Sequence, residues 1–390
     1  MRKIYQLFIL IFLITSCEGE ENTTPEPISK FTLTTQANPE EGGTVFPSSG
    51  DYNDGDQVNV QATPSQYYEF INWGGNGNGS NSNPLNVTIN SNINLIAEFS
   101  KKDSDNDGVT DDIDLCPNTL SEHTQHVSAN GCYEPIYLDE NGITIKAKAF
   151  AAVGDKFTIS DKEYIVVDLD LLKQKIEADE DLEDVVTTFI TDMNFLFLGN
   201  VGFNKDIGYW DVSNVTTMIQ MFDGTIDFDQ DISLWDVSNV TDMGFMFQKT
   251  NFNQDISTWD VSNVISIAGM FAFNVYFNQD ISGWDVSKVI DMSYVFAKTK
   301  HHIIESFNQD ISSWDVSNVT NMKVMFGTSK FDQDISSWDV SKVTNMSGMF
   351  EHSIFNQDLS GWDVSKVTDC AFFAHFNSSW TLPKPNFTGC

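Results

Sequence analysis

The chain has 390 residues, a length that allows two or three domains, and its composition is strongly acidic. It contains 56 acidic and 21 basic residues, which gives a formal net charge of −35. A surface of this charge repels nucleic acids and anionic lipids. The composition therefore excludes a nucleic-acid-binding protein and a protein that binds membranes through basic patches.

The N-terminus is typical of an exported protein. A basic start precedes an apolar run from Leu7 to Ile14, which is too short to span a bilayer, so we predict that residues 1–16 are a signal peptide. The run leads into Ile14-Thr15-Ser16-Cys17, which resembles the lipobox of bacterial lipoproteins, and the resemblance implies that Cys17 is lipidated. The alternative is an ordinary signal peptide with a chance cysteine. We expect residues 17–30 to form a flexible tether.

Residues 31–100 predict a small all-β domain. Apolar and polar residues alternate over 57–62 and 93–99, as they do in half-buried strands, and pairs such as Gly42-Gly43 supply turns. The order of the turns and aromatic residues resembles the divergent InlB B-repeat of bacterial surface proteins. That resemblance implies a β-rich spacer, and the alternative is a β domain of another kind.

Residues 101–132 contain the one motif with definite chemistry. Acidic residues occupy alternate positions of a loop of about 12 residues, a spacing that directs their oxygens at one hard cation, Ca²⁺. The predicted ligands are the side chains of Asp103, Asp105, Asp107, Asp111 and Asp114 and the backbone carbonyl of Val109. The cysteine motifs that follow resemble a thrombospondin type 3 repeat. The alternative is an acidic linker that is merely solvated.

The five cysteines are consistent with export to an oxidising compartment. Setting Cys17 aside leaves two local pairs, Cys116 with Cys132 and Cys370 with Cys390, which we predict to be disulfides. The alternative is free thiols.

Residues 133–202 predict a cap for the repeats that follow. Stretches such as 142–150 and 163–167 have the pattern of strands, and residues 168–178 have helical spacing with Leu172 on the apolar face. A stack of repeats needs a closed first face, which this region can supply. The alternative is an independent catalytic domain.

Seven tryptophans mark seven repeats over residues 203–369, spaced 24 to 30 residues apart: Trp210, Trp235, Trp259, Trp284, Trp314, Trp338 and Trp362. Within one repeat, Asp310-Ile311-Ser312 predicts a short strand, and the three-residue spacing from Val319 predicts a helical turn. A lone coil buries too little apolar surface to fold, so the coils must stack. The pattern predicts an α/β repeat solenoid, preceded by the small all-β domain and the calcium-binding linker.

The repeated Asp-Ile-Ser and Trp-Asp-Val-Ser motifs resemble the BspA-like leucine-rich-repeat family over residues 133–390. The resemblance implies a leucine-rich-repeat-like solenoid on a bacterial surface protein, with adhesion suggested for some members. Ile265, Ile267, Ile290 and Cys370 depart from the repeat pattern. We expect residues 370–390 to form a disulfide-closed C-terminal cap.

The aspartates of the repeats form two columns, one containing Asp206 and its equivalents and one containing the aspartate after each tryptophan. We interpret them as residues that accept hydrogen bonds from backbone N–H groups in turns. The alternatives are weak cation ladders and a carboxylate-based active groove.

Together these features predict a monomeric lipoprotein in the bacterial outer membrane, exposed at the surface and attached to the membrane by its lipid alone. We expect it to act in adhesion or recognition of an extracellular protein or glycan, without catalytic residues. One alternative is capture of polysaccharide through exposed aromatic residues such as Tyr209, Phe245 and Tyr294; another is an enzyme that uses the carboxylate columns. Because the repeated residues serve folding, ligand recognition should reside in the variable ones: Leu234, Thr258, Gly283 and Ser313 before the tryptophans, the Met-to-Phe linkers, and the insert at 298–306.

Overall fold

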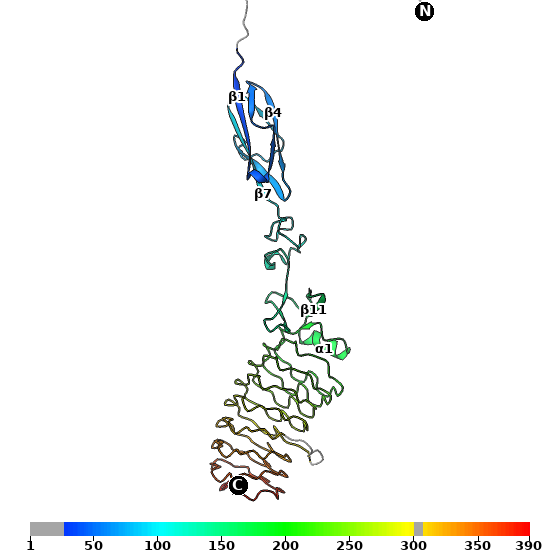
Figure 1. Cartoon of the computed structure of the whole chain (residues 1–390), viewed down its shortest axis with the longest axis vertical. Helices are drawn as coiled ribbons and strands as arrows, with labels where there is room; N and C mark the ends of the chain where they lie inside the picture. The colour runs from blue at the N-terminus through cyan, green and yellow to red at the C-terminus, as the bar shows by residue number, and fades with distance from the viewer. Residues whose placement is uncertain (1–26, 300–306) are drawn as a thin grey trace, which may run out of the picture. The chain divides into compact units, whose positions relative to one another are not determined.

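The computed structural model describes residues 27–299 and 307–390, which form two units, one ending at Tyr133 and one beginning at Glu134 (Figure 1). The predicted signal peptide, the lipidation site Cys17 and most of the tether lie outside the described residues, as does most of the insert. Within the described ranges, no helix has the length and apolar character needed to cross a membrane.

The first unit contains two small sheets around one core. Its elements are β1 (Lys30–Asn38), η1 (Glu40–Gly42), β2 (Gly43–Phe46), β3 (Gly50–Asn53), β4 (Gln57–Pro64), β5 (Tyr68–Gly75), β6 (Leu85–Thr88) and β7 (Ile93–Lys101). The strand orders are β3-β1-β7-β5 and β2-β4-β6, and only β1 and β7 pair in parallel. In β4 every second residue is buried, as the sequence alternation predicts. Trp73 is fully buried in the core, and its indole N–H donates to the Ser82 carbonyl at 2.9 Å.

The segment after β7 is held by turns rather than by a sheet. It contains the short 3₁₀ helix η2 (Thr124–His126), an isolated bridge between Val127 and Tyr133, and a disulfide between Cys116 and Cys132.

The second unit begins with two short sheets and the one α-helix among the described residues. Its elements are β8 (Ile136–Leu138), β9 (Ile145–Ala147), β10 (Lys156–Ile159), β11 (Lys162–Val166), α1 (Leu169–Glu177) and β12 (Val185–Val186). Asp168 caps α1 by accepting a hydrogen bond from the Leu171 N–H at 2.8 Å. Leu172 of α1 is buried in the same apolar core as the first repeats, so this helix covers the first end of that core.

The prediction of an α/β repeat solenoid of the leucine-rich-repeat type is wrong. Residues 191–377, here called the repeat stack, contain no helix in their described part, and their strand character is confined to single parallel bridges between coils. The strand expected at Ile311 is a turn in which its carbonyl accepts from the Trp314 N–H at 3.1 Å. The helical turn expected after Val319 is also absent, because Val324 has a φ of 54° and an α-helix requires a negative φ.

The coils of the repeat stack follow one another along the stack (Figure 1). A backbone ladder joins eight coils and recurs at seven interfaces. At each interface, four N–H groups at alternate residues donate to carbonyls of the following coil; those of the third coil belong to Met243, Phe245, Phe247 and Lys249. One further bond runs the opposite way, as from the Thr241 N–H to the Thr216 carbonyl at 2.8 Å. A coil therefore satisfies its backbone only when it has neighbours.

Aromatic rings fill the interior of the stack in register. Phe222, Phe247 and Phe271 are fully buried and lie nearly parallel, with ring centroids 5.7 and 5.8 Å apart. The indole N–H of Trp235 donates to the Ile207 carbonyl of the preceding coil at 3.1 Å, and the five later tryptophans make the same kind of contact. The repeated large residues thus form one continuous core.

The far end of the stack is closed by its own tail. Cys370 and Cys390 form a disulfide, so the structure contains both cysteine pairs predicted from the sequence. Trp380 packs 4.9 Å from the Phe355 ring, and Phe387 packs 4.8 Å from the Phe373 ring, measured between centroids. These aromatic residues cover the last coil of the core.

Candidate functional site

The predicted calcium loop brings three of its carboxylates together. Asp103, Asp105 and Asp107 offer oxygens that all lie within 4.8 Å of one another. The backbone reverses through positive φ values at Asn106 (60°) and Gly108 (92°), and the Gly108 N–H donates to Asp103 Oδ2 at 3.0 Å. The bend that glycine permits therefore positions the three side chains around one point.

Two oxygens of this cluster are buried without a hydrogen bond. Asp103 Oδ1 and Asp107 Oδ2 have no donor within the described part of the chain, and Asp107 is only 6 % exposed. Burial raises the pKa of Asp107, and the neighbouring aspartate charges raise it further, although the Val109 N–H opposes the shift. A buried, unpaired anionic oxygen is unfavourable unless a cation neutralises it, so this donor set fits a hard divalent ion such as Ca²⁺.

The other predicted ligands are placed differently. Asp111 accepts hydrogen bonds from the Ser104 N–H and hydroxyl, both at 2.8 Å, and these hold the pKa of Asp111 below its usual range. The predicted ligand of Val109 is its carbonyl, but the contact of Val109 with the cluster is made by its N–H, which donates to Asp107 Oδ1 at 2.8 Å. Asp111 is therefore not part of the three-carboxylate group.

Asp114 approaches the cluster from the far end of the loop, and its Oδ1 accepts from the Cys116 N–H at 2.7 Å. Gly131 packs directly against it, because a Cβ there would overlap Asp114 Oδ1 and crowd Asp107 Oδ2. The sequence prediction did not assign Gly131 a role. The sequence feature that could have indicated this role is the Asn130-Gly131-Cys132 motif. The disulfide between Cys132 and Cys116 brings Gly131 back to the loop.

The two aspartate columns of the repeat stack are parts of turns. Asp231 Oδ1 accepts from the Ser233 N–H at 2.9 Å, and Asp236 Oδ1 accepts from the Ser238 N–H at 3.1 Å. Hydrogen bonds from such serines lower the pKa of the equivalent carboxyls of Asp255, Asp260, Asp280, Asp285, Asp310, Asp339, Asp358 and Asp363. The interpretation of the columns as turn-capping residues is confirmed.

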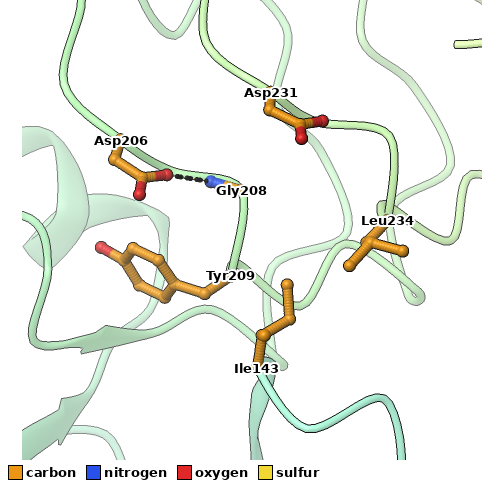
Figure 2. Close-up of a pocket in the computed structure, with 6 residues that line it drawn as sticks. All are labelled: Ile143, Asp206, Gly208, Tyr209, Asp231 and Leu234. Carbon is orange, nitrogen blue, oxygen red and sulfur yellow. Dashed lines mark hydrogen bonds between the residues drawn. The ribbon is translucent and has the colours of Figure 1, made fainter. Parts of the chain in front are cut away.

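A pocket of about 340 Å³ lies at the first two coils, lined by Ile143, Asp206, Gly208, Tyr209, Asp231 and Leu234. Figure 2 shows the Tyr209 ring and the side chains of Leu234 and Ile143 around an opening that the two aspartates border. The Tyr209 hydroxyl donates to the Leu182 carbonyl, and burial raises the pKa of Tyr209. The ring is therefore fixed as a neutral apolar wall.

Gly208 lines the pocket at a position where no larger residue fits. A Cβ at this position would overlap the Asp231 carbonyl oxygen. The next coil has Ser233 at the equivalent position, so the first coil departs from the repeat where the pocket begins.

The residue before each tryptophan distinguishes this pocket from the rest of the stack. In three later coils its hydroxyl donates to a carbonyl of the preceding coil, as Thr258 does to Ser233 and Ser313 to Ser282, both at 3.0 Å. The other two later coils have glycine at this position, Gly283 and Gly361. Leu234 has no hydroxyl and is 55 % exposed. The side chains of Thr258 and Ser313 therefore help to join neighbouring coils, whereas Leu234 places an apolar side chain at the surface.

The other aromatic candidates lie outside this pocket. Phe245 and Tyr294 are half-buried at positive φ values of 58° and 60°. The Phe245 ring occupies the space above Gly269, and the Lys323 ammonium lies 5.8 Å from the Tyr294 ring centroid. Both rings have contacts with the following coil.

Two family models match the chain. The model described as "Mycoplasma protein of unknown function, DUF285" matches residues 169–251, 234–304 and 300–381, which together exceed half of the chain. The model described as "Divergent InlB B-repeat domain" matches residues 33–103, in agreement with the resemblance read from that segment. No curated protein and no solved structure has significant similarity to the chain. The two matches support a surface-associated repeat protein.

Proposed function

We propose, from the premise that the chain belongs to the family described as "Mycoplasma protein of unknown function, DUF285", that it is a non-enzymatic recognition protein. In this proposal the lipid on Cys17 anchors it in the outer membrane, and the repeat stack binds an extracellular ligand. The repeated residues fill the core or satisfy turns, so binding falls to the residues that depart from the pattern.

The observation that carries the proposal is the apolar pair Tyr209 and Leu234 beside two carboxylates (Figure 2). An aromatic face with nearby hydrogen-bond acceptors suits a sugar ring, whose C–H groups pack on the ring and whose hydroxyls donate to Asp206 and Asp231. The pocket is of the size typical of small-ligand sites. We therefore favour an extracellular glycan over a protein as the ligand.

A glycan array tests this proposal, with Leu234→Thr as the diagnostic variant. Threonine at this position reproduces Thr258, whose hydroxyl bonds to the preceding coil, so the variant should fold while losing the apolar wall. We expect binding to weaken by roughly tenfold or more, as for loss of a leucine side chain that the bound ligand buries. Ile354→Thr, at a residue 45 % exposed in the seventh coil, is the matched control. Equal binding by Leu234→Thr and wild type, or no binding to any glycan, would refute the assignment.

The second part of the proposal is that Ca²⁺ binds the 103–114 loop and rigidifies the linker. The support is the pair of unpartnered buried oxygens on Asp103 and Asp107. Calorimetric titration should show that Asp107→Asn abolishes calcium binding. Asp111→Asn should weaken it less, because the Asp111 carboxylate is bound by Ser104. Calcium binding by Asp107→Asn at wild-type affinity would contradict this site.

The lipid anchor is tested independently. Cys17→Ser should move the protein from the membrane fraction to the soluble fraction of the producing cell, and mass spectrometry should detect the acyl chains only on the wild-type N-terminus. Retention of Cys17→Ser in the membrane would remove the anchor from the proposal.

A further inference from the structure

Both ends of the repeat stack carry an unused edge of the ladder that joins the coils. In the last coil, the four N–H groups equivalent to those at the seven internal interfaces belong to Cys370, Phe372, Ala374 and Phe376. Within residues 27–299 and 307–390, none of them donates to an acceptor. The Thr368 carbonyl, which corresponds to the acceptor of the reversed bond, also receives no hydrogen bond from the described chain.

The first coil presents the complementary groups. The carbonyls that would accept four such bonds belong to Asp192, Asn194, Leu196 and Leu198, and none receives a hydrogen bond from a described residue. The Thr191 N–H, which corresponds to the donor of the reversed bond, has no acceptor in the described chain either. The last coil thus has four donors and one acceptor where the first has four acceptors and one donor.

The caps at each end close the apolar core but leave these edges exposed. At the last coil, Phe372 and Phe376 are 63 % and 65 % exposed, and at the first coil Phe195 and Leu198 are 50 % and 49 % exposed. The Phe376 ring contacts the rings of His352 and His375, with centroids 4.5 and 3.8 Å away, and is still largely exposed. Both edges therefore combine unpaired backbone groups with exposed apolar side chains, which is the arrangement that promotes edge-to-edge association.

We propose that the repeat stack associates head to tail with a second copy of this chain, the last coil of one copy pairing with the first coil of the next. The junction repeats the five-bond pattern of the seven internal interfaces. Phe376 then lies over Gly199 of the second copy. Open space surrounds Gly199 on that side, much as Gly269 makes room for the Phe245 ring inside the stack. A heterologous contact of this kind does not close on itself, so it generates linear chains of copies.

One pair of charges sets the conditions for this association. The bridge column runs Asp192, Thr217, Asp242, Ser266, Asp291, Asn321, Asn345 and Asp369, so no two aspartates are adjacent within one copy. A head-to-tail junction places Asp369 beside Asp192 of the second copy. Their repulsion weakens the junction at low ionic strength and is screened by salt, so association should increase with salt concentration.

Sedimentation velocity of the purified chain tests the proposal over a range of protein and salt concentrations. Wild type should form larger species as either concentration rises. Asp192→Asn, which copies Asn321 and Asn345 of the same column, should raise the association constant by roughly fivefold through loss of the repulsion. The double variant Phe372→Asp/Phe376→Asp should abolish association, whereas Tyr276→Asp, at a residue 48 % exposed away from both edges, should not.

A mixing experiment distinguishes head-to-tail pairing from any other contact. Leu198→Asp blocks the first edge, and Phe372→Asp/Phe376→Asp blocks the last edge. Each should be monomeric alone, and the mixture should form a one-to-one dimer and nothing larger, because only one intact pair of edges remains. All these substitutions are at exposed side chains, and circular dichroism melts verify that each variant is folded. A monomeric wild type at every condition, or association that the edge variants leave unchanged, would overturn the proposal.

Discussion

Lys298 should make the stability of the repeat stack depend on pH. It occupies the position held by Lys249 in the third coil and by Thr328 in the sixth, but it lacks their positive φ. As a result its side chain is directed inward and is only 4 % exposed. Its ammonium donates to the Asn274 carbonyl, and no carboxylate among the described residues pairs with it.

The size of this pH dependence follows from the pKa of the buried Lys298 amine. Burial lowers the pKa of Lys298 from 10.5 to about 7 in the folded chain. Between these two values the unfolded chain binds more protons than the folded chain, so the free energy of unfolding rises with pH. The slope is at most about 1.4 kcal/mol per pH unit, and the total gain is on the order of 5 kcal/mol. Below about pH 7 both states are protonated, and Lys298 contributes no further pH dependence.

Urea unfolding of wild type and Lys298→Met at pH 7.5 and 9.5 measures this effect. Wild type should gain up to about 3 kcal/mol between these values, whereas Lys298→Met should gain much less and be the more stable protein at pH 7.5. Lys249→Met, which removes an exposed lysine from the same position two coils earlier, should retain the wild-type dependence. Parallel pH dependence in wild type and Lys298→Met would refute the reasoning.

Three further perturbations test the packing of the stack. Phe247→Ala should lower the free energy of unfolding by about 3–5 kcal/mol because it empties a fully buried site. Phe372→Ala, at a residue 63 % exposed, should lower it by less than about 1 kcal/mol. Equal losses in urea melts would argue against stabilisation by the stacked interior rings. Replacing both Cys370 and Cys390 by serine removes a crosslink between residues 20 apart, worth about 3 kcal/mol. Amide hydrogen exchange should then quicken in the last coil and stay slow in the first, and uniform acceleration would contradict a local role. Thr258→Val should cost about 1 kcal/mol through its lost bond to the preceding coil, and an unchanged urea midpoint would show that this bond is dispensable.

Local patterns predicted the elements whose stability is local. The alternation over 57–62 and 93–99 corresponds to β4 and β7, and the helical spacing over 168–178 corresponds to α1 with Asp168 as its cap. Each of these patterns repeats within a few residues, so the sequence carries it directly.

The secondary structure of the coils was not predictable from spacing alone. Val319, Met322 and Met325 follow one another at intervals of three, which fits a helical turn and equally fits consecutive three-residue turns. The structure has the turns, with the Met325 N–H bonded to the Met322 carbonyl at 3.3 Å and an intervening left-handed residue at Val324. Glycine at the equivalent positions 269 and 348 was the available signal, because glycine favours positive φ.

The two candidate sites differ in how far a sequence can specify them. The calcium ligands lie within one short loop, so their spacing alone brought Asp103, Asp105 and Asp107 into one predicted group, and they lie together in the structure. The Tyr209 pocket needs Ile143, which precedes the repeats and has no periodic relation to Leu234. Departure from the repeat identified one wall, Leu234, because a residue that breaks a structural rule serves something other than the fold. The opposite wall depends on how the segment before β9 folds back on the first two coils, and only tertiary structure determines that.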